Sequence, residues 1–109
     1  MEYRKIAQFE VSTIGMGTYR SFDVRSEADI EVRREIIANC IKTGVSLIDS
    51  SPMYGQAEQV IGRTTDAAGL REKLRFATKV WTRGRSEGQR QIRQSFELMG
   101  TDYVELFQI

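Results

Sequence analysis

Three side chains that can hold or exchange protons lie close behind apolar stretches of this sequence. Asp49 ends one apolar run, Tyr54 follows five residues later in a turn, and Lys79 closes another run. An ammonium near a phenol favours the phenolate form, and a carboxylate can hold that ammonium charged in an ion pair. This combination of groups is suited to proton transfer if the fold brings the three together.

The segments that carry these residues are expected to be buried strands. Residues 45–49 form a short apolar run between Gly44 and a turn rich in Ser, Pro and Gly, which is typical of a strand. A carboxylate is costly inside a core, so Asp49 must lie at the mouth of its strand. Lys79 holds the corresponding place in residues 75–80. Because α/β folds build their sites at the carboxyl ends of strands, we expect one shared rim.

The remaining pattern repeats strand, loop and helix three times and ends on a fourth strand. Strands are predicted at residues 11–17, 45–49, 75–80 and 103–109, and helices at 27–43, 56–64 and 86–99. Short connections and right-handed crossovers make such strands parallel. Residues 1–10 are predicted to form a short hairpin or cap over one end of the sheet. The sequence therefore predicts an α/β fold.

Capping residues set the predicted helix limits. Ser26 is placed to cap the first helix, and Gly44 follows its end as a C′ glycine. Ser86 and Gln89 are predicted to form a capping box for the third helix. The core face predicted for that helix from its spacing is Ile92, Phe96 and Met99.

The composition is ordinary for a globular chain and narrows the class of function. The 109 residues suggest one domain, with 40% hydrophobic and 28% charged residues and a net charge of +1. This balance indicates neither a nucleic-acid partner nor an anionic membrane surface. No apolar run approaches the roughly 20 residues needed to span a bilayer, and residues 1–10 lack a signal-like apolar region. We expect a cytoplasmic location.

Cysteine and histidine usage excludes several chemistries within this sequence. There is one cysteine, Cys40, and no histidine. An internal disulfide, a histidine-based triad and most zinc sites are therefore excluded, and no metal site is predicted. Cys40 lies within a helical pattern and is interpreted as a small core residue rather than a nucleophile.

Several motifs together resemble the aldo-keto reductase family. They are GMGTYR (15–20), GVSLIDSSPMYG (44–55) continuing as YGxxExxxG to residue 62, TKVW (78–81) and DYVELFQI (102–109). The motifs occur in the family's order and separations, and the resemblance covers essentially the whole chain. It implies a (β/α)8 TIM barrel, of which residues 1–109 form a single N-terminal portion with about four parallel strands and three helices.

The resemblance also implies a reaction and a catalytic set. Family members use NAD(P)H to reduce aldehydes and ketones to alcohols with an Asp, a Tyr, a Lys and a His. Asp49, Tyr54 and Lys79 match the first three, with Tyr54 as the general acid aided by the other two. The family's histidine follows the fourth strand directly, one residue beyond Ile109.

Cofactor and substrate contacts follow from the same resemblance. Gly17, Thr18 and Tyr19 are expected near the nicotinamide, with Asp49 close to its ribose. NADPH is the expected cofactor, with NADH as the alternative, and a small-molecule carbonyl compound is the expected substrate. Tyr19 and Trp81 are expected to line the substrate site, although both residues also fit a packing role.

Each polar residue also has a structural interpretation. Asp49 could cap the turn that follows it, and Tyr54 could be a half-buried aromatic of the loop. Lys79 could extend from the strand end into solvent. Glu58 fits a charge in the first turn of a helix, where the helix dipole favours it. The catalytic interpretation gains from all three candidate residues falling at carboxyl ends of strands.

The length leaves three hypotheses for the chain as a whole. A full barrel takes about 250 residues, so the favoured hypothesis is an incomplete reductase that is inactive by itself. The alternative is a half-barrel scaffold or interaction protein that self-associates through its first and fourth strands, the open edges of the sheet. A third hypothesis is that weak cofactor binding and carbonyl reduction persist without the histidine.

Overall fold

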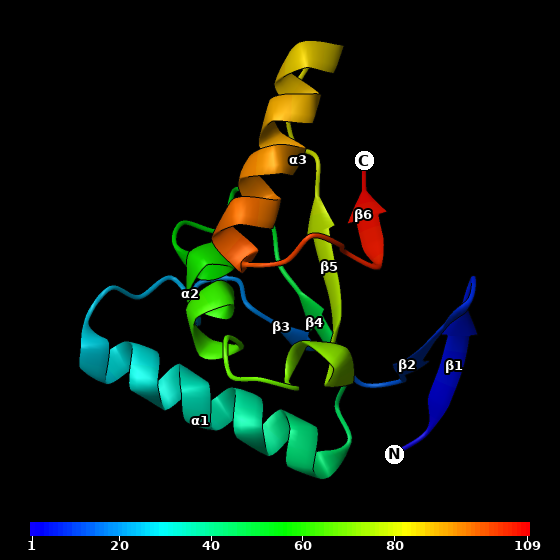
Figure 1. The fold of residues 1–109 in the computed structure, drawn as a ribbon, viewed down its shortest axis with the longest axis vertical. Coiled ribbons are helices and arrows are strands. Elements are labelled where there is room, and N and C mark those ends of the chain that lie inside the picture. Colours follow the sequence, from blue (N-terminus) through cyan, green and yellow to red (C-terminus); the bar gives the residue numbers. More distant parts are fainter.

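Three helices cover a parallel sheet, and a separate hairpin lies away from them (Figure 1). A computed structural model describes all of residues 1–109. The elements are β1 Tyr3–Ile6, β2 Phe9–Ser12, β3 Met16–Gly17, α1 Glu27–Thr43, β4 Leu47–Asp49, α2 Ala57–Thr64, the 3-10 turn η1 Arg71–Lys73, β5 Arg75–Lys79, α3 Arg85–Met99 and β6 Leu106–Gln108.

The sheet has four parallel strands in the order β3-β4-β5-β6. Gly17 pairs with Asp49 in register, and Lys79 pairs with Gln108. The carboxyl ends of the strands therefore lie side by side along one rim. The predicted architecture of four parallel strands and three helices is confirmed, and β3 and β6 form the two edges of the sheet.

The first predicted core strand, residues 11–17, is wrong. Residues 11 and 12 belong to β2, which pairs antiparallel with β1 in the hairpin expected near the N-terminus. Only Met16–Gly17 joins the parallel sheet. The chain leaves the hairpin at Ser12, which holds the start of β4 by two bonds with Ser46, from Ser12 N to Oγ at 3.0 Å and from Ser46 N to Oγ at 2.9 Å. The hairpin thus covers the amino ends of the strands, as a cap would.

The hydrophobic core lies between the helices and the sheet. Its ten buried members are Phe22, Ile30, Ile37, Ile48, Ala57, Val60, Ile61, Leu74, Phe76 and Met99. The predicted caps of α1 are confirmed, because Ser26 Oγ accepts from Asp29 N at 3.1 Å and Gly44 adopts φ of 88°. A left-handed residue at this place favours glycine. These caps define where α1 begins and ends.

The start and the buried face of α3 differ from prediction. Gly84, with φ of 87°, precedes the helix and no side chain caps it, so the predicted capping box at Ser86 is wrong. The buried residues of the helix are Gln91, Ser95 and Met99. Two of them are polar because each has a hydrogen-bond partner: Gln91 Oε1 accepts from Trp81 N at 2.6 Å, and Ser95 Oγ donates to the buried Glu58 carboxylate. Helical spacing of apolar residues could not reveal such a face.

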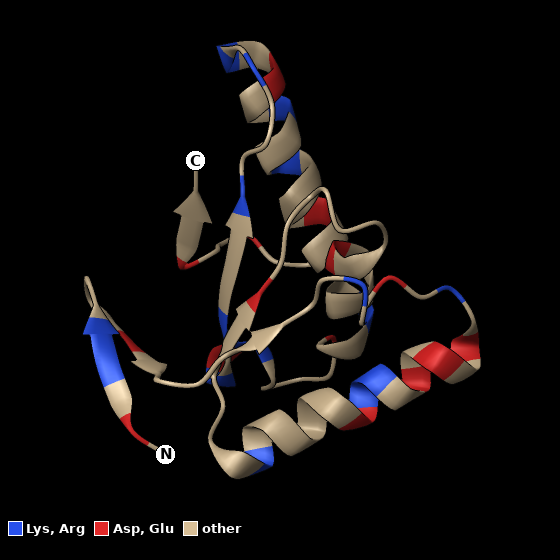
Figure 2. Cartoon of the chain, turned by 180° about the vertical axis from the view of Figure 1, so that it is seen from behind, with Lys and Arg blue, Asp and Glu red and all other residues tan.

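Surface charge is mixed in sign. Figure 2 shows acidic and basic residues interleaved along α1 and α3. None of the helices has the length and apolar character required to cross a membrane. Cys40 is half-buried, 3.6 Å from Met16 Sδ, and desolvation raises the pKa of its thiol. A raised pKa disfavours the thiolate, which agrees with the core interpretation of this residue.

Candidate active site

Asp49 and Lys79 form an ion pair at the rim of the sheet. They end the neighbouring strands β4 and β5, so their side chains emerge together. Lys79 Nζ lies 3.2 Å from each Asp49 carboxylate oxygen and donates to the Ser50 carbonyl at 2.6 Å. The Lys79 side chain is only 17% exposed, compared with 38% for Asp49. The lysine is therefore held in place rather than extended into solvent.

Tyr54 joins this pair from the loop between β4 and α2. Lys79 Nζ lies over the Tyr54 ring, 5.0 Å from its centroid. On another side the Tyr19 ring meets Tyr54 edge to face, with centroids 5.1 Å apart and planes at 76°. The structure thus brings the predicted acid, phenol and amine together, although they lie far apart in the sequence.

Gly17 and Thr18 lie beside the pair at the end of β3. Thr18 is fully buried, and its Oγ1 is 2.9 Å from both the Asp49 carbonyl oxygen and Ser50 Oγ. This hydroxyl ties β3 to β4 directly below the ion pair. Gly17 is exposed, and a Cβ built on it would meet no atom within 4 Å. The space beside Asp49 is therefore open at Gly17.

The two predicted substrate-site aromatics are strongly exposed. Tyr19 is 59% exposed and Trp81 is 65% exposed, and they follow β3 and β5 at the same rim. Trp81 lines a hollow with Val80, Thr82, Arg83 and Ile109. Packing of Trp81 against the core is contradicted by this exposure, whereas Tyr19 packs against Tyr54.

Sequence reasoning missed Gln108. Its Nε2 donates to Asp49 Oδ1 at 3.0 Å from the last position of β6. The Asp49 carboxylate therefore receives hydrogen bonds from both Lys79 and Gln108. A polar residue near the end of an otherwise apolar strand was the available signal, the same one that revealed Lys79.

Glu58 lies in the core next to the site, not on the helix surface. It is 2% exposed and accepts from Thr78 Oγ1 at 2.6 Å and from Ser95 Oγ at 2.9 Å. Desolvation raises the pKa of Glu58, while these two hydroxyls and the charge of Lys79 act in the opposite direction. A structural role is confirmed, but its basis is a buried link between α2, β5 and α3 rather than the helix dipole.

Parallel strands covered by helices, with a carboxylate, an ammonium and a phenol at their carboxyl ends, define an α/β protein of the TIM-barrel class. The family model described as "Aldo/keto reductase family" matches residues 13–109. The chain belongs to the aldo/keto reductase family.

Curated relatives agree with this family. Aldo-keto reductase YhdN of Bacillus subtilis (strain 168) is 30% identical over 124 residues, which covers 100% of this chain and 38% of the relative. An aldo-keto reductase of Mycobacterium sp. (strain MCS) is 37% identical over 87 residues, covering 77% of this chain and 29% of that protein. The chain thus spans well under half the length of these relatives.

Solved structures support the fold. A thermostable aldo-keto reductase in complex with the inhibitor epalrestat superposes with a TM-score of 0.82 at 28% identity, over 98% of this chain and 42% of that one. An aldo-keto reductase from Klebsiella pneumoniae in complex with NADPH gives 0.79 at 27% identity, over 92% of this chain and 35% of that one. The predicted fold class, part of a (β/α)8 TIM barrel, is confirmed.

Proposed function

We propose that this chain contributes the proton-transfer site of an NADPH-dependent carbonyl reductase, with Tyr54 as the general acid. The observation that carries the proposal is the cluster at the rim: Lys79 bonds Asp49 at 3.2 Å and lies 5.0 Å from the Tyr54 ring. A phenol, an ammonium and a carboxylate in contact suit the reduction of a carbonyl group, which builds negative charge on oxygen.

Each residue of the cluster has one step in this mechanism. NADPH, when bound, supplies the hydride that attacks the carbonyl carbon. Tyr54 donates its phenolic proton to the carbonyl oxygen as charge develops there. Lys79 stabilises the phenolate that Tyr54 becomes, because an opposite charge close by favours the ionised form. Asp49, which also accepts from Gln108, orients the ammonium by its ion pair.

Two observations support NADPH as the cofactor: the open space at the rim of the sheet and the cofactor bound in a related structure. The open space at Gly17, beside Asp49, leaves room for a nicotinamide and its ribose. Thr18 would contribute through its backbone, because its hydroxyl already bonds Ser50 and the Asp49 carbonyl. The related Klebsiella pneumoniae enzyme is solved with NADPH, which favours NADPH over NADH.

The proposed substrates are small aldehydes and ketones, bound against Tyr19 and Trp81. Both aromatics are exposed at the rim, where a substrate would meet Tyr54. Relatives include proteins named methylglyoxal reductase in Escherichia coli (strain K12) and glycerol 2-dehydrogenase (NADP(+)) in Saccharomyces cerevisiae. These names favour a reductase over the alternative of a self-associating scaffold built on the edges of β3 and β6.

Removing the Tyr54 hydroxyl tests the proposal. In a complete reductase barrel that contains this chain, oxidation of NADPH by a panel of aldehydes is expected to slow by roughly a hundredfold or more in Tyr54→Phe, because a positioned general acid contributes at least that much. Tyr103→Phe is the matched control, since it removes an exposed phenol in the segment before β6, outside the cluster. Unchanged turnover of that barrel in Tyr54→Phe contradicts the proposal.

A further inference from the structure

Two segments that are far apart in the chain meet around Tyr54. Residues 18–23, here called the holding segment, contact residues 50–56, the Tyr54 loop, at three places. These are Thr18 Oγ1 to Ser50 Oγ at 2.9 Å, the Tyr19 ring to the Tyr54 ring at 5.1 Å, and Gln56 N to Asp23 Oδ1 at 2.9 Å. The two outer contacts bracket the loop, and Tyr54 lies between them.

The holding segment is itself firmly anchored. Phe22 is 1% exposed and belongs to the hydrophobic core. Arg33 from α1 donates through Nε to the Ser21 carbonyl at 2.7 Å. Because Phe22 and Arg33 fix the holding segment, its contacts can fix the position of the neighbouring Tyr54 loop.

Asp23 supplies a hydrogen bond that the Tyr54 loop cannot make for itself. The first amides of a helix lack acceptors within the helix, and the N-cap residue of α2, Gln56, makes no side-chain bond to them. The Asp23 carboxylate accepts from Gln56 N instead. A negative charge at this end of α2 is also favoured by the helix dipole. The nearest opposite charge is Arg25, 3.8 Å away and 72% exposed.

Gly55 shows how closely Asp23 is seated on the loop. Its φ of 60° lies in the left-handed region, and a Cβ there would overlap the Asp23 carboxylate. The left-handed turn therefore favours glycine, and a side chain there would displace the Asp23 carboxylate from its present position. The contact lies one residue after Tyr54, so a shift of the turn at Gly55 moves the phenol.

We propose that Asp23 is a positioning residue for Tyr54: it fixes the turn at Gly55 and thereby sets the place of the phenol over Lys79. Asp23 touches neither the Asp49–Lys79 pair nor the Tyr54 hydroxyl, so it acts through the loop backbone alone. The importance of this position rests on the proposed role of Tyr54. The contact itself is testable without any measurement of carbonyl reduction.

Nuclear magnetic resonance of the labelled chain tests the proposal. In the unaltered protein, Gln56 N–H is expected to be protected from solvent exchange, and the Tyr54 ring to show contacts with the Tyr19 ring. Asp23→Ala is expected to speed exchange at Gln56 about tenfold or more, as for loss of a bond to a charged acceptor, and to weaken the ring contacts. Asp23→Asn, which keeps an oxygen at the same place, is expected to restore both signals.

Asp66→Ala provides the matched control. It removes the same charge just beyond the other end of α2, where Asp66 bonds Arg34 at 3.1 Å. It should leave the Tyr54 and Gln56 signals unchanged. A folded Asp23→Ala chain with unaltered signals at both residues overturns the proposal. If Asp23→Ala does not fold, rapid exchange of Gln56 N–H in the unaltered protein overturns it equally.

Discussion

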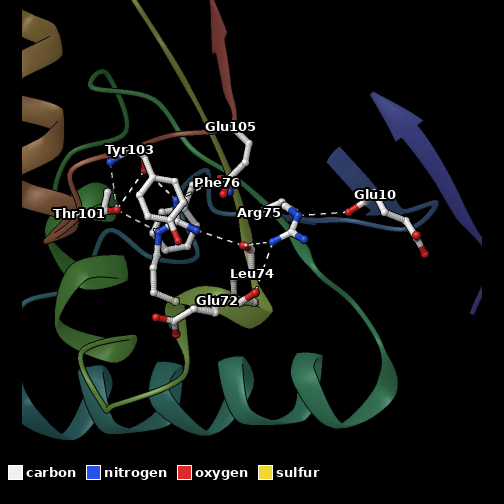
Figure 3. Close-up of polar contacts among 9 residues, drawn as sticks. Glu10, Glu72, Leu74, Arg75, Phe76, Thr101, Tyr103 and Glu105 are labelled. Carbon is white, nitrogen blue, oxygen red and sulfur yellow. Dashed lines mark hydrogen bonds and ion pairs between the residues drawn. The ribbon is translucent and has the colours of Figure 1, made fainter. Parts of the chain in front are cut away.

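Arg71 contacts several segments that are distant in the sequence, and no sequence motif indicates this role. Its guanidinium lies 4.1 Å from the Phe76 ring centroid and 4.0 Å from that of Tyr103. Its bonds reach the Thr101 hydroxyl, the carbonyls of Leu74 and Tyr103, and the Glu105 carboxylate. Figure 3 shows the labelled side chains of this region, with Glu105 above Tyr103 and Phe76. One side chain thus ties η1 and β5 to the segment that enters β6.

Removing the Arg71 guanidinium should destabilise the fold strongly. Arg71→Met leaves the Glu105 carboxylate, whose side chain is 4% exposed, without its ion-pair partner. Loss of one member of a buried pair costs about 3–5 kcal/mol in the free energy of unfolding, measurable by urea titration. Adding Glu105→Gln should recover part of this loss, because the two side chains interact. If the losses in the free energy of unfolding of the two single variants simply add in the double variant, the two side chains are not coupled.

Residue roles could be predicted from the sequence where one polar side chain interrupts an apolar run. That signal revealed Asp49 and Lys79, since a charge at a strand end must lie at the rim of a sheet. Gln108 carried the same signal more weakly because it is uncharged. Asp23 and Arg71 carried none, since their partners come from sequence-distant loops and from backbone groups.

At the scale of elements, α2 and α3 pack closely together at Gly62. A Cβ built on Gly62 would collide with the Leu98 carbonyl oxygen, near the end of α3. The glycine that ends the YGxxExxxG motif is thus explained by helix packing. It allows α2 to lie close enough for Glu58 to reach Ser95 on α3.

Two glycine replacements separate this contact from helix propensity. Gly62→Ala should lower the free energy of unfolding by about 1–3 kcal/mol, because overlap with backbone outweighs the gain of about 1 kcal/mol from alanine in a helix. Gly88→Ala is the control, since its Cβ would meet only Val80 Cγ1 at 3.7 Å, and it should stabilise α3. Thermal unfolding of both variants measures the difference. A stabilised Gly62→Ala protein would remove the packing explanation.

The prediction of an element is correct where capping residues mark its limits. It is wrong where contacts with distant segments decide the structure. α1 has a serine cap and a left-handed glycine, and its predicted limits match the structure. The strand predicted at residues 11–17 is wrong because Val11 pairs with β1 in the hairpin. Only two residues of the predicted strand then join the parallel sheet. The predicted buried face of α3 is wrong because Gln91 and Ser95 are buried and make hydrogen bonds there, which apolar spacing does not reveal.

Across the whole molecule, stability should depend on pH through Glu58. The folded-state pKa of Glu58 is raised above the ordinary value of 4.5, so the folded chain keeps a proton that the unfolded chain releases. The contribution of Glu58 to stability is therefore complete below pH 4.5 and is lost as pH rises through the folded-state pKa.

Glu58→Gln tests this dependence. The amide can still accept from Thr78 and Ser95 but does not ionise, so the variant should gain stability relative to the unaltered protein as the pH is raised from acidic to neutral. Urea unfolding at several pH values measures the difference. Glu97→Gln, at an exposed position of α3, should show no such trend. A constant difference between Glu58→Gln and the unaltered protein argues against the raised pKa.

The order β3-β4-β5-β6 has a consequence for biosynthesis, because spatial neighbours are also chain neighbours. Each strand leaves the ribosome after the strand on which it docks, and one α-helix lies between each pair of neighbouring strands in the sequence. Nascent chains fold from their amino end. The sheet can therefore grow in the direction of translation, from β3 towards β6.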